Sequence, residues 1–133
     1  MRLTTKSEYA LLALAHLGRQ ETGRYVNVDS IAEAQGIPRQ YLEQILLAVK
    51  RARIVQSSKG QRGGYRLAKQ PGMITLAEVI RLFDGPIAAT QSVSRYYYES
   101  TPIEREKRLV RVFKEIRDIV SKRLESTTLA DVL

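Results

Sequence analysis

The sequence predicts a mainly α-helical protein with a small β-hairpin, organised as a winged helix-turn-helix domain plus a long C-terminal dimerisation helix. Three observations predict this. Apolar residues recur at three- and four-residue steps on two neighbouring segments between residues 28 and 49. A glycine-rich turn then separates two short β-prone runs. Near the C-terminus, one apolar stripe continues for about six helical turns.

The first element is a helix within MRLTTKSEYALLALAHL. Leucine and alanine surround it on nearly every side, which is typical of a helix buried among several neighbours. His16, the single histidine of the chain, lies on this helix. An isolated histidine in such a setting is expected in the core or at an interface rather than in catalysis.

Two short helices separated by a glycine turn follow. Gly36 lies where the first helix needs a left-handed residue to end, and Pro38 has the fixed φ that suits a first helical turn. A tight turn of this kind leaves the second helix free to enter a DNA major groove, whereas an ordinary helical hairpin is the alternative. The apolar positions of the pair are Val28, Ile31, Ala32, Ile37, Leu42, Ile45, Leu46 and Val49.

A β-hairpin comes next, formed by IVQSS (54–58) and YRLA (65–68) around the turn KGQRGG. Lys59 and Arg62 supply positive charge at its tip, and Gly60, Gly63 and Gly64 allow the loop to lie in a minor groove or against phosphates. A solvated basic turn would have a similar composition. Directly after a helix-turn-helix, the hairpin predicts a wing.

The charge balance favours a polyanionic partner. Lysine and arginine number 22 against 14 acidic residues, which gives a net charge of +8 and a pI near 10.0. Solubility through excess charge is the alternative explanation. Outside the hairpin, we expect Arg2, Lys6, Arg39 and Lys50 on the DNA-binding side. The chain has no apolar segment of membrane-spanning length and no cleavage-site pattern near its start, so the sequence predicts an unprocessed cytoplasmic protein.

A further helix begins after Thr75, in LAEVIRLFDG, and ends at Gly85-Pro86. Residues 86–102 show no clear period and are rich in serine and threonine, so we expect a loop or a poorly ordered segment between a domain at 1–85 and a C-terminal part at 103–133. Tyr96, Tyr97 and Tyr98 are its unusual feature. They suit a dimer seam, or alternatively stacking on a ligand or partner.

The long helix is predicted from Ile103 to Leu124, with Glu104 and Glu106 suited to its positive N-terminal end. A single small domain cannot cover so long a stripe, but the same helix of a second copy can. Two-fold pairing would also set two recognition helices about 34 Å apart. The expected dimer-interface residues are Leu109, Val112, Phe113, Ile116, Ile119, Val120 and Leu124.

MRLTTKSEYALLAL, YLEQIL, GGYRLA, the T-x-x-E-V-I helix with DGPI after it, and STTLADVL together resemble the Rrf2 family of winged-helix regulators over almost the whole chain. The resemblance implies a homodimeric bacterial transcription factor, usually a repressor. It implies that bases are contacted from the start of the recognition helix, at Gln40, Tyr41, Glu43 and Gln44. It also places the wing, Lys59 to Gly64, in the flanking minor groove.

The chain departs from that family at the sensor. Cluster-binding members carry three cysteines in the loop before the dimer helix, whereas this chain has none, and Ser92 stands near the first expected position. Glu8 matches an acidic ligand of some relatives, but one carboxylate cannot hold an iron-sulfur cluster alone. We therefore expect no metal and no cofactor, and control by a small-molecule effector, a protein partner or the protein's own concentration. Whether Ser92 replaces a native cysteine stays open.

Catalysis is not expected, because the chain has no P-loop, no nucleotide-binding glycine fingerprint and no metal-ligand spacing. The sequence predicts a sequence-specific DNA-binding regulator, most simply a dimeric repressor. One alternative is an interaction module in which the winged domain and the tyrosine loop bind a metabolic enzyme. Another is a winged helix that binds RNA, or binds duplexes without discrimination.

Overall fold

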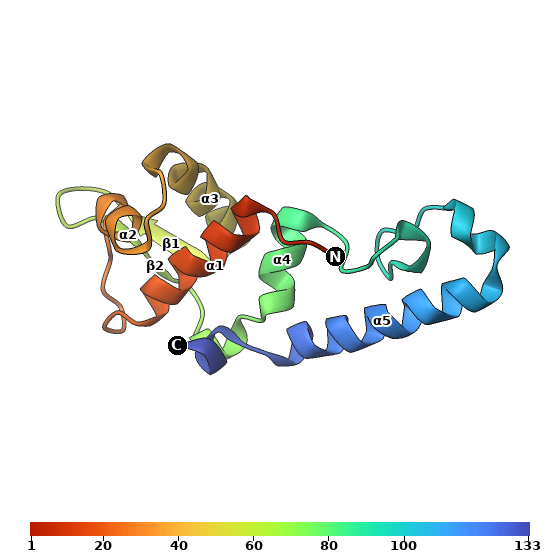
Figure 1. Cartoon of the computed structure of the whole chain (residues 1–133). Coiled ribbons are helices and arrows are strands. Elements are labelled where there is room, and N and C mark those ends of the chain that lie inside the picture. Colours follow the sequence, from red (N-terminus) through yellow and green to blue (C-terminus); the bar gives the residue numbers. More distant parts are fainter.

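The computed structural model describes residues 1–133 and divides into a helical domain with a hairpin and an arm that extends from it (Figure 1). The mainly helical class with one two-stranded hairpin is confirmed. None of the helices is long and apolar enough to span a membrane. The elements in chain order are α1 (Thr5–Gly18), α2 (Val28–Gln35), α3 (Arg39–Arg51), β1 (Val55–Ser58), β2 (Gly64–Leu67), α4 (Leu76–Asp84) and α5 (Lys107–Ser126).

The turn between α2 and α3 forms as the sequence predicts, with one shift. Gly36 ends α2 in the left-handed conformation, at φ 64° and ψ 33°. Pro38 was predicted inside the first turn of α3, but its ψ of 129° is extended, so it is the N-cap residue and the helix begins at Arg39. At the other end of α2, the side chain of Asn27 caps the helix by accepting a hydrogen bond from the Ser30 amide at 2.8 Å.

The wing hairpin pairs β1 and β2 antiparallel, with Val55 opposite Leu67 and Ser58 opposite Gly64. The predicted strand runs are confirmed to within one residue at each end. Val26, in the segment before α2, adds an isolated bridge to Tyr65, in which each amide donates to the other's carbonyl oxygen at 2.8 Å. The wing is therefore attached on its second strand to the entry of the helix-turn-helix.

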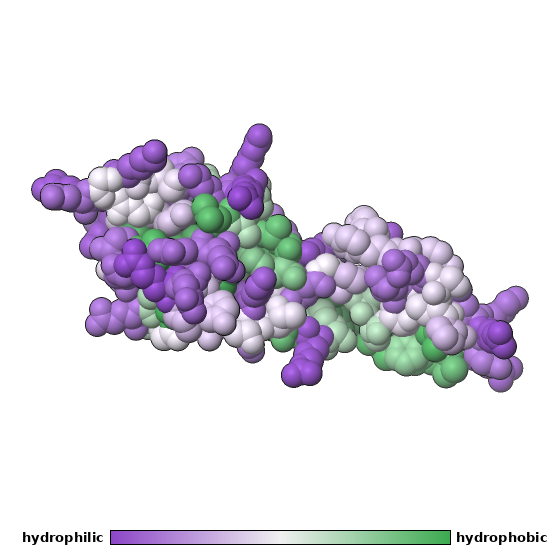
Figure 2. Space-filling model, turned by 90° about the horizontal axis from the view of Figure 1, so that it is seen from above, coloured by the Kyte–Doolittle hydropathy of each residue, from purple (hydrophilic) through white to green (hydrophobic).

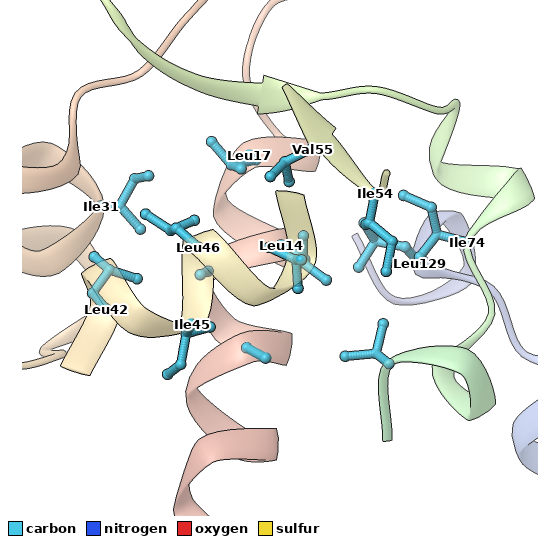
Figure 3. Packing of buried hydrophobic residues seen from close by; sticks show 14 of the residues in the cluster. Leu14, Leu17, Ile31, Leu42, Ile45, Leu46, Ile54, Val55, Ile74 and Leu129 are labelled. Carbon is cyan, nitrogen blue, oxygen red and sulfur yellow. The ribbon is translucent and has the colours of Figure 1, made fainter. Parts of the chain in front are cut away.

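The core lies around α1, as its almost wholly apolar surface predicts. Ala10, Ala13, Leu14 and Leu17 are buried, and the same cluster takes side chains from α2, α3 and β1. Figure 3 shows Leu14 and Leu17 beside the side chains of α3 and the hairpin. His16 is only half-buried, and its ring nitrogen lies 3.5 Å from the Gln20 amide nitrogen.

The start of α4 and the segment that follows α5 lie next to each other in the winged domain. Thr75 and Glu78 form a reciprocal capping box at the start of α4, which confirms the predicted helix start. Thr75 also forms an isolated bridge with Thr128. Leu129, beyond α5, is 1% exposed and belongs to the main core cluster. The segment after α5 thus packs against the winged domain and anchors the C-terminal end of α5 there.

The predicted start of the long helix at Ile103 is wrong by four residues. Pro102–Arg105 form a 3₁₀ turn, and Glu106 has an extended ψ of 96°, so α5 begins at Lys107. Glu104 consequently lies outside the helix. The preceding segment is a loop, as predicted, but an ordered one, with a 3₁₀ turn at Gln91–Val93 and Val93 buried at 1% exposure.

Candidate nucleic-acid interface

The outer face of α3 is a row of polar side chains. Gln40, Tyr41, Glu43 and Gln44 are all exposed at its N-terminal half, with Tyr41 at 48%. The opposite face is buried, because Leu42, Ile45, Leu46 and Val49 pack into the core. The structure therefore brings the four predicted base-contacting residues together on one accessible surface. The opposite face of the same helix is fixed by its packing in the core.

Arg39 joins α2 and α3 across the turn. Its Nε donates to Glu43 Oε1 at 3.1 Å, one turn further along α3, and its Nη1 donates to Asp29 in the first turn of α2. Both carboxylates raise the pKa of Arg39, the hydrogen bond to Glu43 most. The sequence interpretation missed Asp29, because an acid in a first helical turn is already explained by the helix dipole.

The wing tip carries Lys59 and Arg62, both exposed and neither in an ion pair. The glycines beside them have an internal role that the sequence does not reveal. A Cβ on Gly63 would lie 2.3 Å from the Ser58 carbonyl oxygen, so the tip folds back on its own first strand. Gly60 has a φ of 100°, a conformation that disfavours any residue with a side chain.

The remaining predicted cations are scattered around the domain. Arg2 precedes α1, Lys6 lies in its first turn, and Lys50 lies in the last turn of α3. All three are exposed, and none takes part in an ion pair. No acidic side chain neutralises them, so they add to the positive charge of the domain. Their contact with DNA stays a prediction.

The apolar residues of α5 divide between two faces. Val120 and Leu124 pack against a small cluster in the same chain formed by Ala77, Ile80 and Ile87, and Phe113 is half-buried. A second stripe remains uncovered, and Figure 2 shows hydrophobic surface gathered on the arm. The exposed fractions in this stripe are 47% for Leu109, 49% for Val112, 44% for Ile116 and 70% for Ile119.

The loop before α5 exposes the three tyrosines. Tyr96, Tyr97 and Tyr98 are 69%, 46% and 61% exposed, and the Arg81 guanidinium lies 5.2 Å from the centre of the Tyr96 ring. Tyr98 donates to Glu104 at 2.5 Å, and hydrogen bonds from Ser100 and then Tyr98 lower the pKa of Glu104. These contacts join the loop to α4 and to the turn before α5, and they leave all three side chains exposed.

The same loop does not offer the ligands of an iron-sulfur cluster. Ser92 is buried, and its hydroxyl accepts a hydrogen bond from Thr101 at 2.6 Å, beside Thr90. Clusters are held by thiolates, and the chain contains no cysteine. A trio of neutral hydroxyl groups bonded to one another does not fit that group.

Comparison with known proteins agrees with this geometry. The chain is 32% identical to the HTH-type transcriptional regulator CymR of Bacillus subtilis over 99% of this chain and 89% of CymR. It is 38% identical to Rv1287, a candidate HTH-type transcriptional regulator of Mycobacterium tuberculosis, over 99% of this chain and 81% of the relative.

Solved structures give the same result. CymR, described as the global cysteine regulator of B. subtilis, superposes with a TM-score of 0.80 at 31% identity over 99% of this chain and 95% of that chain. T. potens IscR superposes with a TM-score of 0.75 at 28% identity, over 99% and 85%. These matches favour a DNA-binding regulator over a protein-interaction module. The Rrf2 family, described as iron-dependent transcriptional regulators, matches residues 3–133, and the chain belongs to this family of helix-turn-helix transcriptional regulators.

Proposed function

We propose that the protein binds a specific DNA duplex as a homodimer and represses transcription there, without an iron-sulfur cluster. The observation that carries the dimer is the uncovered stripe of Leu109, Val112, Ile116 and Ile119 on α5. Their spacing of three, four and three residues is that of a helix pair packed along one seam. The role as a repressor rests on the family resemblance alone.

A second copy of α5 is the occupant that this stripe fits best. A two-fold axis brings the same residues of both copies together, so each apolar side chain meets another. The arm carries the stripe away from the winged domain, which leaves α3 and the wing of each copy free (Figure 1). Two such domains about one DNA turn apart, about 34 Å, can occupy successive major grooves on one side of the duplex.

Base recognition in this proposal comes from the exposed row on α3. Glu43 can accept a hydrogen bond from a cytosine amino group, and Gln44 can bridge the edge of an adenine. Arg39 holds Glu43 in place and makes its carboxylate less free to turn away. Gln40 and Tyr41 lie at the helix start, where either a base or a phosphate is within reach of a groove-bound helix.

Control by oxygen or iron through a cluster is not part of the proposal, because the hydroxyl groups near Ser92 cannot replace thiolates. After anaerobic incubation with iron and sulfide, the protein is expected to show no cluster absorbance and unchanged DNA affinity in air. A brown chromophore with stoichiometric iron would contradict this. Control then falls to a small-molecule effector, a protein partner or the protein's concentration.

The proposal is tested by selecting duplexes from a random pool with the purified protein at two salt concentrations. We expect a shared motif to be enriched, with binding that weakens steeply as salt rises because bound phosphates release counterions. A scrambled version of the enriched duplex is the control. Equal affinity for the two duplexes would contradict sequence-specific binding. Binding without salt dependence would contradict the proposed contacts with the DNA backbone.

A further inference from the structure

A cleft of about 340 Å³ lies between the entry to α2 and the wing tip. Its walls come from the segment Arg24–Asn27, from Ser30 on α2 and from Gln61–Gly63 on the wing. The bridge between Val26 and Tyr65 holds these two parts of the chain together, and the Tyr25 ring is covered by the Arg66 guanidinium at 4.5 Å. Both contacts join the Arg24–Asn27 wall to β2, the strand that directly follows the wing tip.

The lining of the cleft is positive. Arg24 and Arg62 contribute guanidinium groups, and no carboxylate lines the cleft. Neither arginine forms an ion pair, whereas Arg39, Arg81, Arg95 and Arg117 are all paired with acids elsewhere. Two unpaired guanidinium groups in one concave site suit a phosphate group, which accepts hydrogen bonds from arginine in a fork geometry.

The end of α2 does not by itself account for the site. The Asn27 side chain already accepts from the Ser30 amide, so the helix cap is satisfied within the protein. Attraction in the cleft must come from Arg24 and Arg62, with the exposed hydroxyl of Ser30 as a neutral donor. Arg24 lies four residues before α2, outside the recognition helix and the wing tip to which the sequence analysis assigned most of the DNA contacts.

We propose that this cleft binds a phosphodiester of the DNA backbone, with Arg24 as a contact residue that the helix-turn-helix and wing patterns do not include. The inference rests on the proposed DNA-binding function and deepens it. Arg62 belongs to the wing, so a phosphate held between Arg62 and Arg24 belongs to the DNA strand that runs next to the wing. The cleft thereby fixes the position of the wing relative to α2 on the duplex and contributes no base preference.

The test uses the full chain and the duplex that the wild-type protein enriches from a random pool. Arg24→Gln removes one positive charge from the cleft, and Arg19→Gln removes one from an exposed residue of the same domain outside it. Affinity is measured by fluorescence anisotropy over a range of salt concentrations. Thermal unfolding of each variant checks that the fold is retained, and Arg24→Lys keeps the charge without the guanidinium fork.

Arg24→Gln is expected to bind the enriched duplex roughly tenfold more weakly and to lose a similar factor on a scrambled duplex. Its salt slope should fall by about 0.9 for each lost phosphate contact, and so by about 1.8 for a dimer. Arg24→Lys should restore most of the slope. Arg19→Gln should change neither quantity appreciably.

Equal DNA affinity of Arg24→Gln and Arg19→Gln would overturn the proposal that the cleft binds a DNA phosphate, while leaving the proposed DNA-binding function intact. Failure of the wild-type protein to enrich any duplex would overturn both. Inorganic pyrophosphate distinguishes a free anion from DNA. If it raised the unfolding temperature of the wild-type protein but not of Arg24→Gln, and both bound the duplex equally, the cleft would belong to a small anion instead.

Discussion

A Cβ atom on Gly64 would lie 2.1 Å from the carbonyl oxygen of Val26. That carbonyl accepts from the Tyr65 amide at 2.8 Å, so the wing strand and the entry to α2 lie too close together for a side chain at position 64. Gly64 also has a φ of 146°. The glycine is therefore required by the attachment of the wing to the domain, independently of any contact with DNA.

Replacing Gly64 by alanine should destabilise the protein by about 2 kcal/mol or more, because the added methyl must push the Val26 segment away in a backbone conformation unfavourable for alanine. The measurement is the free energy of unfolding in urea. Gly72→Ala is the matched control, since a Cβ there meets nothing within 4 Å and its φ is not in the left-handed region. Equal effects of the two changes would show that the close approach at Val26 is unimportant.

Glu43→Ala and Gln44→Ala should each weaken binding to the enriched duplex by about 1 to 3 kcal/mol and change binding to a scrambled duplex little. Glu33→Ala on α2 removes an exposed acid away from the α3 row and controls for the change in net charge. The measurement is the affinity of each variant for the enriched duplex and for the scrambled duplex. Losses of the same size on both duplexes would make Glu43 and Gln44 structural residues, with Glu43 acting only as a partner of Arg39.

Removing the charge of Lys59 or Arg62 should weaken binding to every duplex and reduce the salt slope by about one for each phosphate contact. The cause is the loss of a cation at the exposed tip of the wing. Affinity is measured at several salt concentrations for Lys59→Ala, Arg62→Ala and the double variant. If the double variant kept its affinity throughout, the tip would not contact DNA.

The helices were predictable where local chemistry decides them. Gly36 and the Thr75 capping box mark boundaries through contacts within four residues, and both boundaries agree with the sequence interpretation. The start of α5 was not predictable in this way. Apolar and charged residues continue their helical spacing through 103–106, but Pro102 starts a 3₁₀ turn and Glu106 is extended, so the chain changes direction before the helix.

The candidate site was predictable by position but not by interaction. The resemblance to the family selects Gln40, Tyr41, Glu43 and Gln44, and the helical spacing of the apolar residues at 42, 45, 46 and 49 leaves these four on the outer face of α3. The pairing of Arg39 with Asp29 depends on how α2 and α3 cross, which no single-helix pattern contains. Likewise, the apolar stripe of the predicted long helix does not reveal that Val120 and Leu124 pack against their own chain while Ile116 and Ile119 face outward.

Ile116→Glu should convert the protein to monomers, because a buried, unpaired carboxylate on each copy would have to be desolvated in the middle of the seam. Val120→Glu is less informative, since Val120 packs within its own chain. Sedimentation measures the oligomeric state, and Lys114→Gln changes the charge by the same amount at another exposed position of α5. An Ile116→Glu protein that remained dimeric would exclude this stripe as the interface.

In the proposed complex, two winged domains joined through α5 hold one duplex at two equivalent sites. Hydroxyl-radical footprinting on the enriched duplex measures this directly. Two protected regions related by a two-fold axis are expected, with centres about one turn of DNA apart, and both should be lost in Ile116→Glu at the same protein concentration. A single protected region, or a symmetric footprint that persists in a monomeric variant, would contradict it.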